Sequence, residues 1–307
     1  MSDLGIVIVN YNTCELLRDC LASIANSVDA PRYRVLVVDN GSSDDSAAMV
    51  HSEFPWVQLI VSQRNGGYAY ANNLGLRALG FDGGAVKGDA RPRYVLLLNP
   101  DTVLPPEALA AMTAYLEDHP DVGAVGPKLV RRDGSLDKAC RRSFPSPAVS
   151  FYHFAGLDRL FPHSARFGRY NLSYLDPDLE TEVDALVGAF MLLRAEALER
   201  AGLLDERFFM YGEDIDLCYR IKQRGWRIVY YPRVTVLHIK GASSRKASRR
   251  AIAAFYDAMK IFHDKHYRAR TCFLVNWGID LGIALLRHWA LFRDHLRPAE
   301  RKRVASA

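Results

Sequence analysis

Paired cysteines are missing from this 307-residue chain, which has five cysteines and no Cys-x-x-Cys spacing. An odd number of cysteines in so long a chain argues against a disulfide framework. The thiols are therefore expected to be reduced, as they are in the cytosol, and we expect a cytoplasmic protein.

Long hydrophobic runs are missing as well. No run of about 18 apolar residues occurs, so no transmembrane helix is predicted. The chain enters a strand-like pattern at residues 4–9 without a basic leader or a cleavage site. We therefore expect no signal peptide.

A strong excess of one charge is also absent. Lys and Arg number 40 against 35 Asp and Glu, which leaves a net charge of +5. This excess is too small to indicate a nucleic-acid partner, and zinc-finger spacing and aromatic RNA-binding runs do not occur. The length suffices for one large domain, or for one domain with an extension.

The first 125 residues alternate between apolar runs and helical patterns. Strands are predicted at residues 5–9, 33–38, 57–61, 94–98 and 122–125, and helices at 14–25, 42–51, 68–79 and 105–118. Continuous apolar strands separated by helices indicate an α/β fold with a doubly wound, mostly parallel sheet. Residues 131–182 lose this periodicity. Strand patterns return at 185–193, 227–231 and 234–237, and helical patterns at 195–201 and beyond 251.

Polar clusters, and not glycine-rich phosphate motifs, follow the predicted strands. Neither GxGxxG nor GxxxxGK[ST] occurs, which weakens dehydrogenase and P-loop interpretations. The clusters after the first four strands are Asn10-Tyr11-Asn12, Asp39-Asn40-Gly41, Arg64-Asn65-Gly66-Gly67 and Asn99-Pro100-Asp101. Each cluster alone is typical of a turn. All four at the carboxyl edge of one sheet indicate a ligand site.

These residue types suit a nucleotide bound together with a metal ion. Asp39 can accept a hydrogen bond from a base imide, Tyr11 can stack on a base, and Arg64 can pair with a phosphate. Asp101 offers the hard oxygen ligand that suits Mg²⁺ or Mn²⁺ bridging a diphosphate. His238 ends a predicted strand, where it is either a second metal ligand or a structural histidine.

Three carboxylates, Glu213, Asp214 and Asp216, lie within four positions before an amphipathic helical pattern. On that helix Asp216 and Arg220 are expected to face outward, while the apolar residues face the core. Glu213 and Asp214 then lie at the helix N-terminus, where the helix dipole favours anions. The plain alternative is a capped surface helix. The polar clusters described above favour a functional site.

Five segments in order along residues 5–241 carry a resemblance to a known family. They are Val9-Asn10-Tyr11-Asn12, Val38-Asp39-Asn40-Gly41-Ser42-Ser43-Asp44, Leu98-Asn99-Pro100-Asp101-Thr102, Gly188-Ala189-Phe190 and Phe209-Met210-Tyr211-Gly212-Glu213-Asp214-Ile215-Asp216-Leu217. Together they resemble family 2 glycosyltransferases, and more narrowly the bacterial rhamnosyltransferase-like members. The resemblance implies a GT-A fold over residues 1–240, with a nucleotide-binding half at about 1–102 and an acceptor half at about 103–240. Residues 241–307 then form a basic loop and C-terminal helices.

The resemblance also implies a metal-dependent, inverting transfer of a hexosyl group without a covalent intermediate. Asp214 is then the general base, and Glu213 positions the acceptor or orients Asp214. Asp101 and His238 hold Mg²⁺ or Mn²⁺. The implied nucleotide-binding residues are Asn10, Tyr11, Asn12, Asp39, Arg64, Asn65 and Asn99. Asn99 replaces the first Asp of the usual Asp-x-Asp motif, a form that the rhamnosyltransferase-like subgroup shares.

The implied donor is dTDP-L-rhamnose, and the implied acceptor is a lipid-linked or polysaccharide intermediate of cell-envelope glycan synthesis. A UDP-linked sugar is an alternative donor, and a catalytically silent sugar-binding relative is an alternative function. A silent relative should have lost Asp101 or the Glu213–Asp214 pair, and this chain keeps both. A sugar nucleotidyltransferase should carry a glycine-rich N-terminal loop with an activating Arg and Lys, which residues 8–12 lack.

Residues 271–296 predict a C-terminal helix with an unusual pattern. Asn276, Asp280, Arg287 and Asp294 lie near one stripe, and apolar residues cover much of the rest. The helix either packs on the catalytic domain or on a dimer partner, or it lies on an anionic membrane surface. Asp280 and Arg287 interrupt the apolar run, so we do not expect it to span a bilayer. A homo-oligomer and a peripheral location on the inner face of the plasma membrane stay open.

Overall fold

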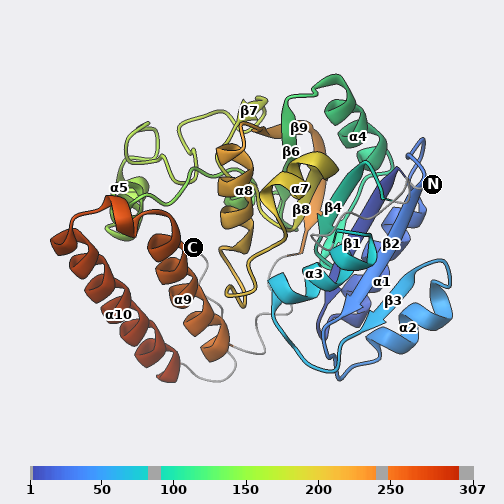
Figure 1. The fold of residues 1–307 in the computed structure, drawn as a ribbon, viewed down its shortest axis with the longest axis horizontal. Coiled ribbons are helices and arrows are strands. Elements are labelled where there is room, and N and C mark those ends of the chain that lie inside the picture. The colour runs from blue at the N-terminus through green and yellow to red at the C-terminus, as the bar shows by residue number, and fades with distance from the viewer. Residues whose placement is uncertain (1–2, 82–90, 240–247, 297–307) are drawn as a thin grey trace.

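A nine-stranded sheet lies at the centre of the part that the computed structural model describes, residues 3–81, 91–239 and 248–296 (Figure 1). The strand order is β3-β2-β1-β4-β8-β6-β9-β5, and β7 pairs with β9. The first four strands pair in parallel: β1 (Leu4–Asn10), β2 (Tyr33–Asp39), β3 (Gln58–Val61) and β4 (Tyr94–Leu98). Strand β8 (Phe190–Arg194) runs antiparallel between β4 and β6 (Val122–Val130), and β6 is parallel to β9 (Arg227–His238). The sheet is mostly parallel, as predicted, and the antiparallel pairs of β8 make it a mixed sheet.

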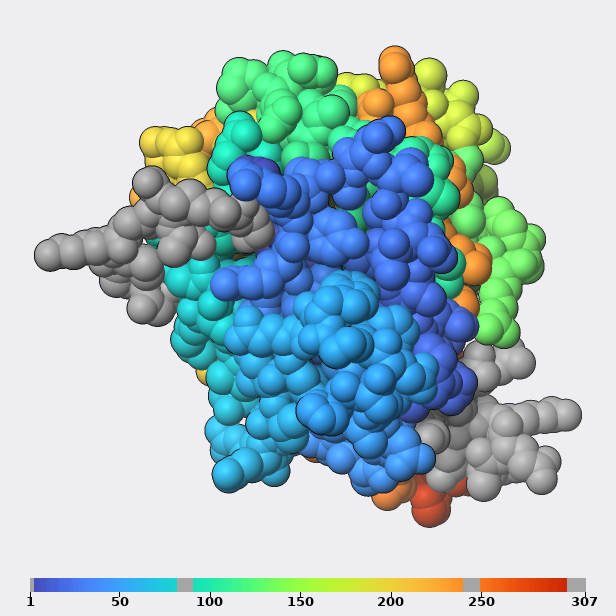
Figure 2. Space-filling model, turned by 90° about the vertical axis from the view of Figure 1, so that its right-hand side faces the viewer, coloured from blue at the N-terminus to red at the C-terminus, as the bar shows by residue number. Residues whose placement is uncertain are grey.

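Strands β1 and β4 are buried along their whole length because helices cover both faces of the sheet (Figure 1), whereas the edge strand β3 is partly exposed. Every residue of β1 is buried, as its continuous apolar run predicts. Helix α3 (Tyr68–Ala78) approaches the sheet closely at Gly75, where a Cβ atom would lie 2.5 Å from Val7 Cγ1. The other helices of the α/β part are α1 (Cys14–Ala25), α2 (Ser46–Glu53), α4 (Ala108–Asp118), α7 (Ala195–Ala201) and α8 (Glu213–Gln223). In the side view of Figure 2, the N-terminal part of the chain, coloured blue to cyan, makes up most of the visible face.

The second half differs from the sequence prediction in its strand boundaries. The two strands expected at 227–231 and 234–237 are one strand, β9, which contains an irregularity. There Pro127 pairs with Tyr231 but Lys128 pairs with Thr235, so β9 has extra residues at Pro232. Proline has no N–H for the ladder, and a bulge accommodates it. The short strand expected at 122–125 continues to Val130 as β6.

The aperiodic stretch 131–182 forms short elements that wrap one end of the sheet. They are η1 (Lys138–Cys140), α5 (Pro147–Phe154), α6 (Leu157–Leu160) and β7 (Thr181–Glu182). Strand β5 (Thr102–Val103) pairs antiparallel with the end of β9, so that Thr102 lies opposite His238. This pairing places the loop after β4 beside the end of β9.

A helical hairpin follows the sheet, made of α9 (Ser248–His266), η3 (Arg268–Arg270) and α10 (Phe273–His295). In Figure 1, α9 lies between α8 and α10. The expectation that Asp216 faces outward is wrong, because it is fully buried and binds the hairpin. Asp216 Oδ1 lies 2.7 Å from His266 Nε2 and 2.7 Å from Lys265 Nζ, and Arg220 Nε donates to Asp216 Oδ2 at 2.9 Å. The helical pattern of residues 213–223 gives no information about partners 50 positions away in the sequence.

Two sequence predictions concern the region around this hairpin. Most of the expected basic loop, residues 240–247, lies outside the described residues. Within the described ranges, none of the helices combines the length and apolarity that crossing a bilayer requires.

Candidate active site

The loops after β1 and β2 meet at one edge of the sheet, as predicted. Asn10 is fully buried, and its Nδ2 donates to Asp39 Oδ1 at 3.1 Å. Asn10 Oδ1 accepts from Thr13 Oγ1 at 2.7 Å, and Asp39 Oδ2 accepts from the Ser42 N–H at 3.1 Å. The hydrogen bonds of Asn10 and Asp39 therefore hold the loops after β1 and β2 together.

The loop after β3 touches the loop that precedes α8. Asn40 Nδ2 donates to Asn65 Oδ1 at 3.1 Å, and Asn65 Oδ1 also accepts from the Gly67 N–H at 3.1 Å. Gly67 has φ +94°, and a Cβ atom there would lie 2.3 Å from the Phe209 carbonyl oxygen. The Tyr68 N–H donates to that same oxygen at 2.7 Å. Only glycine permits this close approach of the two loops.

A cavity of about 1560 Å³ opens at this edge of the sheet. Single small-molecule sites usually occupy about 300–1,000 Å³, so the cavity has room for two substrates. The predicted site residues that line it are Tyr11, Asn65, Asn99, Asp101, Glu213, Asp214 and His238.

Four predicted nucleotide-binding residues do not line the cavity: Asn10 and Asp39, whose hydrogen bonds are given above, and Arg64 and Asn12. The Arg64 guanidinium lies over the Tyr70 ring, 5.5 Å from its centroid. Asn12 has φ +55°, and its Oδ1 accepts from the Ser43 N–H at 2.7 Å. In this structure the Arg64 and Asn12 side chains therefore support loops.

Asp101 and His238 lie together although 137 positions separate them in the chain. His238 Nε2 lies 3.3 Å from Asp101 Oδ1, and its Nδ1 lies 2.9 Å from Asp137 Oδ2. All three side chains are less than a tenth exposed. Burial opposes a charged imidazole, but the contacts with Asp101 and Asp137 outweigh it and raise the pKa of His238 to about 9. The surroundings thus favour a positive charge between the two carboxylates.

These residues fit a divalent metal ion. Asp101 Oδ1 and His238 Nε2 are both buried, and neither has a hydrogen-bond partner in the part of the chain that the structure describes. Asp137 binds the other imidazole nitrogen, as outer carboxylates do for metal-bound histidines. Across residues 3–81, 91–239 and 248–296, no group of three or more His, Cys, Asp or Glu side chains is placed to hold a metal. The protein would therefore supply two ligands, and a bound diphosphate would supply others.

The Asp214 carboxylate is held by three donors. Arg142 Nη2 donates to Asp214 Oδ2 at 2.7 Å, the Gly188 N–H donates to the same oxygen at 3.3 Å, and the Ile215 N–H donates to Oδ1 at 2.7 Å. The Tyr68 hydroxyl fixes Gly188 by donating to its carbonyl oxygen at 2.8 Å. The pairing with Arg142 fixes the direction of the Asp214 carboxylate.

Glu213 differs from its neighbour. Its Oε2 is buried and has no hydrogen-bond partner among the described residues. Burial first, and then repulsion from Asp214, raise the pKa of Glu213 to about 8. The backbone before it is unusual, since Tyr211 has φ +71° and Gly212 φ +83°. With its pKa raised in this way, the Glu213 carboxyl group can donate a hydrogen bond, whereas the Asp214 carboxylate accepts one from Arg142.

Sequence reasoning missed two residues of this site, Arg142 and Asp137. Both lie in the aperiodic stretch 131–182, where neither helical nor strand periodicity marks a face. Their roles depend on contacts with Asp214 and His238, 72 and 101 positions away. No signal in the single sequence identifies these pairs.

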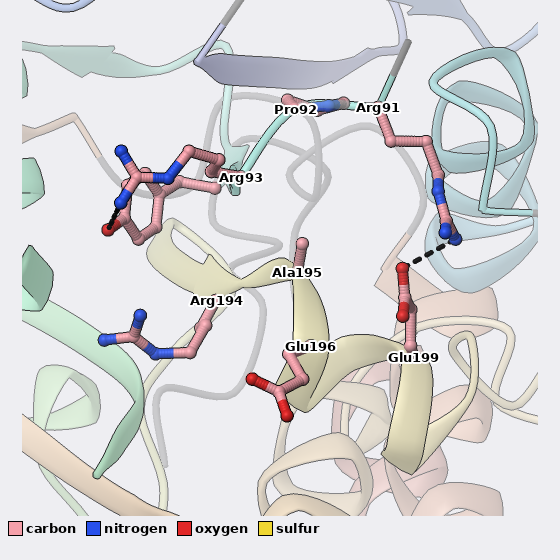
Figure 3. Close-up of a pocket in the computed structure, with 8 residues that line it drawn as sticks. Arg91, Pro92, Arg93, Arg194, Ala195, Glu196 and Glu199 are labelled. Atoms are coloured by element: carbon pink, nitrogen blue, oxygen red, sulfur yellow. Dashed lines mark hydrogen bonds and ion pairs between the residues drawn. The ribbon is translucent and has the colours of Figure 1, made fainter. Parts of the chain in front are cut away.

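A second pocket, of about 370 Å³, lies at the opposite end of β4 (Figure 3). Arg91 Nη1 pairs with Glu199 Oε1 at 2.6 Å, and Arg93 Nη2 donates to the Tyr94 hydroxyl at 3.3 Å. Arg194 Nε donates to the Val122 carbonyl oxygen at 3.0 Å. These cations already have partners, so we assign no ligand to this pocket.

The family profile described as "Glycosyltransferase like family 2" matches residues 2–256. The N-acetylglucosaminyl-diphospho-decaprenol L-rhamnosyltransferase of Mycobacterium tuberculosis is 31% identical over 305 residues, which cover 98% of this chain and 96% of that protein. The rhamnosyltransferase WbbL of Escherichia coli is 26% identical and covers 90% of this chain and 96% of its own length.

Solved structures agree on the fold. The mannosyltransferase PcManGT from Pyrobaculum calidifontis, in complex with GDP-Man and Mn²⁺, has a TM-score of 0.54 at 20% identity and covers 94% of this chain and 72% of its own. GalNAc-T7 with UDP, GalNAc and Mn²⁺ also gives 0.54, at 15% identity, but only 44% of that chain is covered against 78% of this one. The expected GT-A fold with C-terminal helices is confirmed. The chain is a glycosyltransferase and belongs to glycosyltransferase family 2.

Proposed function

We propose that this glycosyltransferase inverts the anomeric centre as it transfers L-rhamnose from dTDP-L-rhamnose to a lipid-linked acceptor of cell-envelope glycan synthesis. One observation carries the proposal: the Glu213–Asp214 pair and the Asp101–His238 pair line the same cavity. The rhamnosyl specificity is supported by the two relatives named above, both rhamnosyltransferases. The lipid-linked acceptor is supported by the diphospho-decaprenol in one relative's name.

The proposed chemistry is a single displacement. The acceptor hydroxyl attacks the anomeric carbon, and the nucleoside diphosphate leaves from the opposite face. Asp214 takes the hydroxyl proton as the new bond forms. Arg142 and the Gly188 N–H hold one carboxylate oxygen, so the carboxylate keeps its direction during the reaction. Glu213, which carries a proton below about pH 8, donates a hydrogen bond into the site.

The donor is proposed to occupy the sheet-edge half of the cavity. Tyr11, Asn65 and Asn99 line this half, while Asn10 and Asp39 brace its loops. Asp39 is the proposed partner of the base, and Arg64 and Asn12 are proposed to turn toward the nucleotide only when it binds. The nucleotide-binding half of the chain, about residues 1–102, would then hold the donor, and residues 103–240 the acceptor.

Asp101 and His238 would hold Mg²⁺ or Mn²⁺, which when bound neutralises the charge that develops on the leaving diphosphate. Asp137 binds the Nδ1 side of His238, so that Nε2 stays directed at Asp101.

A transfer assay tests the proposal. Purified protein is incubated with an N-acetylglucosaminyl-diphosphate lipid, Mn²⁺ and one of several nucleotide sugars. We expect dTDP release and a rhamnosylated product by mass spectrometry. Release of UDP from a UDP-sugar, with no release of dTDP from dTDP-L-rhamnose, would show that the donor is UDP-linked. No nucleotide release with any donor and acceptor, from protein that still binds dTDP, would favour the silent sugar-binding relative.

A membrane surface is the second proposed partner. The polar stripe of α10 faces α9: Asn276 binds His263 at 2.7 Å, and Asp280 Oδ1 lies 3.0 Å from Lys260 Nζ. The opposite face is apolar and exposed, with side chains from 42% to 78% accessible at Phe273, Leu274, Trp277, Leu281, Leu285, Trp289 and Phe292. Tryptophans on such a face suit the headgroup region of a bilayer. A dimer partner is the alternative occupant, so a homo-oligomer is the competing outcome of the liposome assay described below.

A further inference from the structure

The large cavity continues well past the carboxylates into the α9–α10 hairpin. Beside Glu213 and Asp214 its lining includes two cationic side chains, Arg142, which donates to Asp214, and Arg250, which lies over the Phe209 ring. Farther along, α9 contributes Phe255, Met259 and Phe262, α10 contributes an apolar face, and α5 contributes Phe151 and Phe154. The same cavity thus changes from charged to apolar along its length.

The cavity face of α10 is distinct from both of its other faces. It consists of Val275, Gly278, Ile279, Gly282, Ile283 and Leu286. These residues recur at three- and four-residue spacing, so they form one side of the helix. A Cβ atom added at Gly278 or Gly282 would meet no atom of the described residues within 4 Å. The two glycines therefore widen the cavity where a larger side chain would fill it.

The chemistry of this apolar part limits what can occupy it. A bound peptide would bring N–H and C=O groups that need hydrogen-bond partners. The α9 and α10 residues that line this part offer mainly hydrocarbon, methionine and aromatic side chains. A hydrocarbon chain needs no polar partners, and burying it in such walls is favourable.

The charged end of the cavity fits the group to which such a chain would be attached. This end contains Arg250, whose guanidinium lies 4.0 Å from the Phe209 ring centroid, and Asp214, the proposed base. An anionic diphosphate next to Arg250 would place the attached sugar near Asp214 and leave the hydrocarbon toward α10. The exposed apolar face of α10 lies next to this cavity face and could pass the rest of a long chain to a bilayer.

We propose that the groove lined by α5, α9 and α10 binds the first isoprene units of a prenyl-diphosphate acceptor. This inference rests on the proposed function, because it names the part of the site that selects the lipid. The groove selects chain length and saturation near the diphosphate, while the catalytic pair acts only on the sugar.

Prenyl diphosphates of increasing length test the groove without any need for turnover. Isopentenyl, geranyl and farnesyl diphosphate share one headgroup and differ only in the chain. Calorimetric titration into the full-length protein should give an affinity that rises by roughly tenfold or more from five to fifteen carbons, because each added buried carbon is favourable. The variant Gly282→Leu should reduce this dependence by roughly tenfold, since the new side chain occupies the groove.

Gly282→Leu is expected to fold, since leucine is a better helix former than glycine and the site is open. Ala284→Leu, on the exposed side of α10, is the matched control and should keep the wild-type dependence on length. Affinity that does not change with chain length in the wild type, or a dependence that Gly282→Leu leaves intact, would overturn the inference. Either result, with sugar transfer still observed, leaves the proposed function standing. Loss of transfer to every acceptor would instead overturn the function.

Discussion

Replacing Asp214 by Asn removes the proposed base and also breaks a buried ion pair. Arg142 Nη2 lies 2.7 Å from Asp214 Oδ2, and both side chains are 10% exposed. Removing one partner of such a pair leaves a buried charge uncompensated, which costs about 3–5 kcal/mol. A loss of activity in Asp214→Asn alone would therefore mix lost chemistry with lost folding.

A double variant separates the two effects. In Arg142→Met/Asp214→Asn no buried charge is left unpaired, so most of the lost stability should return. Arg142 Nη2 also donates to the Leu186 carbonyl oxygen at 2.7 Å. Because the double variant loses that bond, its free energy of unfolding should stay about 1 kcal/mol below that of the wild type. Activity should not return, because asparagine cannot accept a proton. We expect kcat to stay about 10²–10⁴-fold below wild type.

The two quantities are measured independently. Urea unfolding gives the free energy of unfolding, and initial rates at saturating donor and acceptor give kcat. Calorimetric binding of dTDP serves as the control that the donor half is intact. A folded Asp214→Asn protein with a near wild-type rate would show that Asp214 is not the base. If Glu213→Gln lost the activity instead, the base would be Glu213.

Two further predictions concern the same cavity, and a third concerns the exposed face of α10. Burial raises the pKa of Glu213 from its ordinary value of 4.5 to about 8. Between these two pH values the native protein keeps a proton that the unfolded chain has lost. The free energy of unfolding therefore falls as pH rises through this window, by about 1.4 kcal/mol per pH unit. Glu213→Gln should therefore gain stability over wild type from pH 5 to pH 8 in urea unfolding, and an unchanged difference contradicts the assignment. EDTA should abolish sugar transfer, and added Mn²⁺ should restore it in the wild type but not in Asp101→Ala. The Asp137→Asn variant should need about 10–100-fold more metal for the same rate. Full activity in EDTA would argue against a metal. Anionic liposomes should bind the full chain in a salt-sensitive manner but not a folded protein that ends after His266, and equal binding of both rejects the membrane role of α10.

The strand-end residues could be predicted because their information is local. An apolar run ends, a polar cluster follows, and parallel topology brings such ends to one edge. The register of β1 on β2 accordingly pairs Asn10 with Asp39. The pairing of Asp101 with His238 also follows from topology, since β5 and β9 set Thr102 opposite His238.

The rest of the site could not be predicted because its partners lie far apart in sequence. Arg142 is unmarked in an aperiodic stretch, and only the fold brings it to Asp214. Asp216 was expected at the surface because a charged residue in a helical pattern usually faces water. Its burial depends on Lys265 and His266, which another helix supplies.

The buried Asp216 has a consequence for how the acceptor is placed. Helix α8 carries Asp214 in its first turn, and Asp216 two positions later binds Lys265 and His266 at the end of α9. Helix α9, which lines the apolar groove together with α5 and α10, is thereby fixed to the helix that carries the proposed base. A prenyl chain bound in that groove would be held at a constant distance from Asp214, the proposed acceptor of the hydroxyl proton. Since misplacement by about 1 Å can cost roughly 100-fold in rate, a buried ionic anchor between α8 and α9 is a physical reason for a charged residue at position 216.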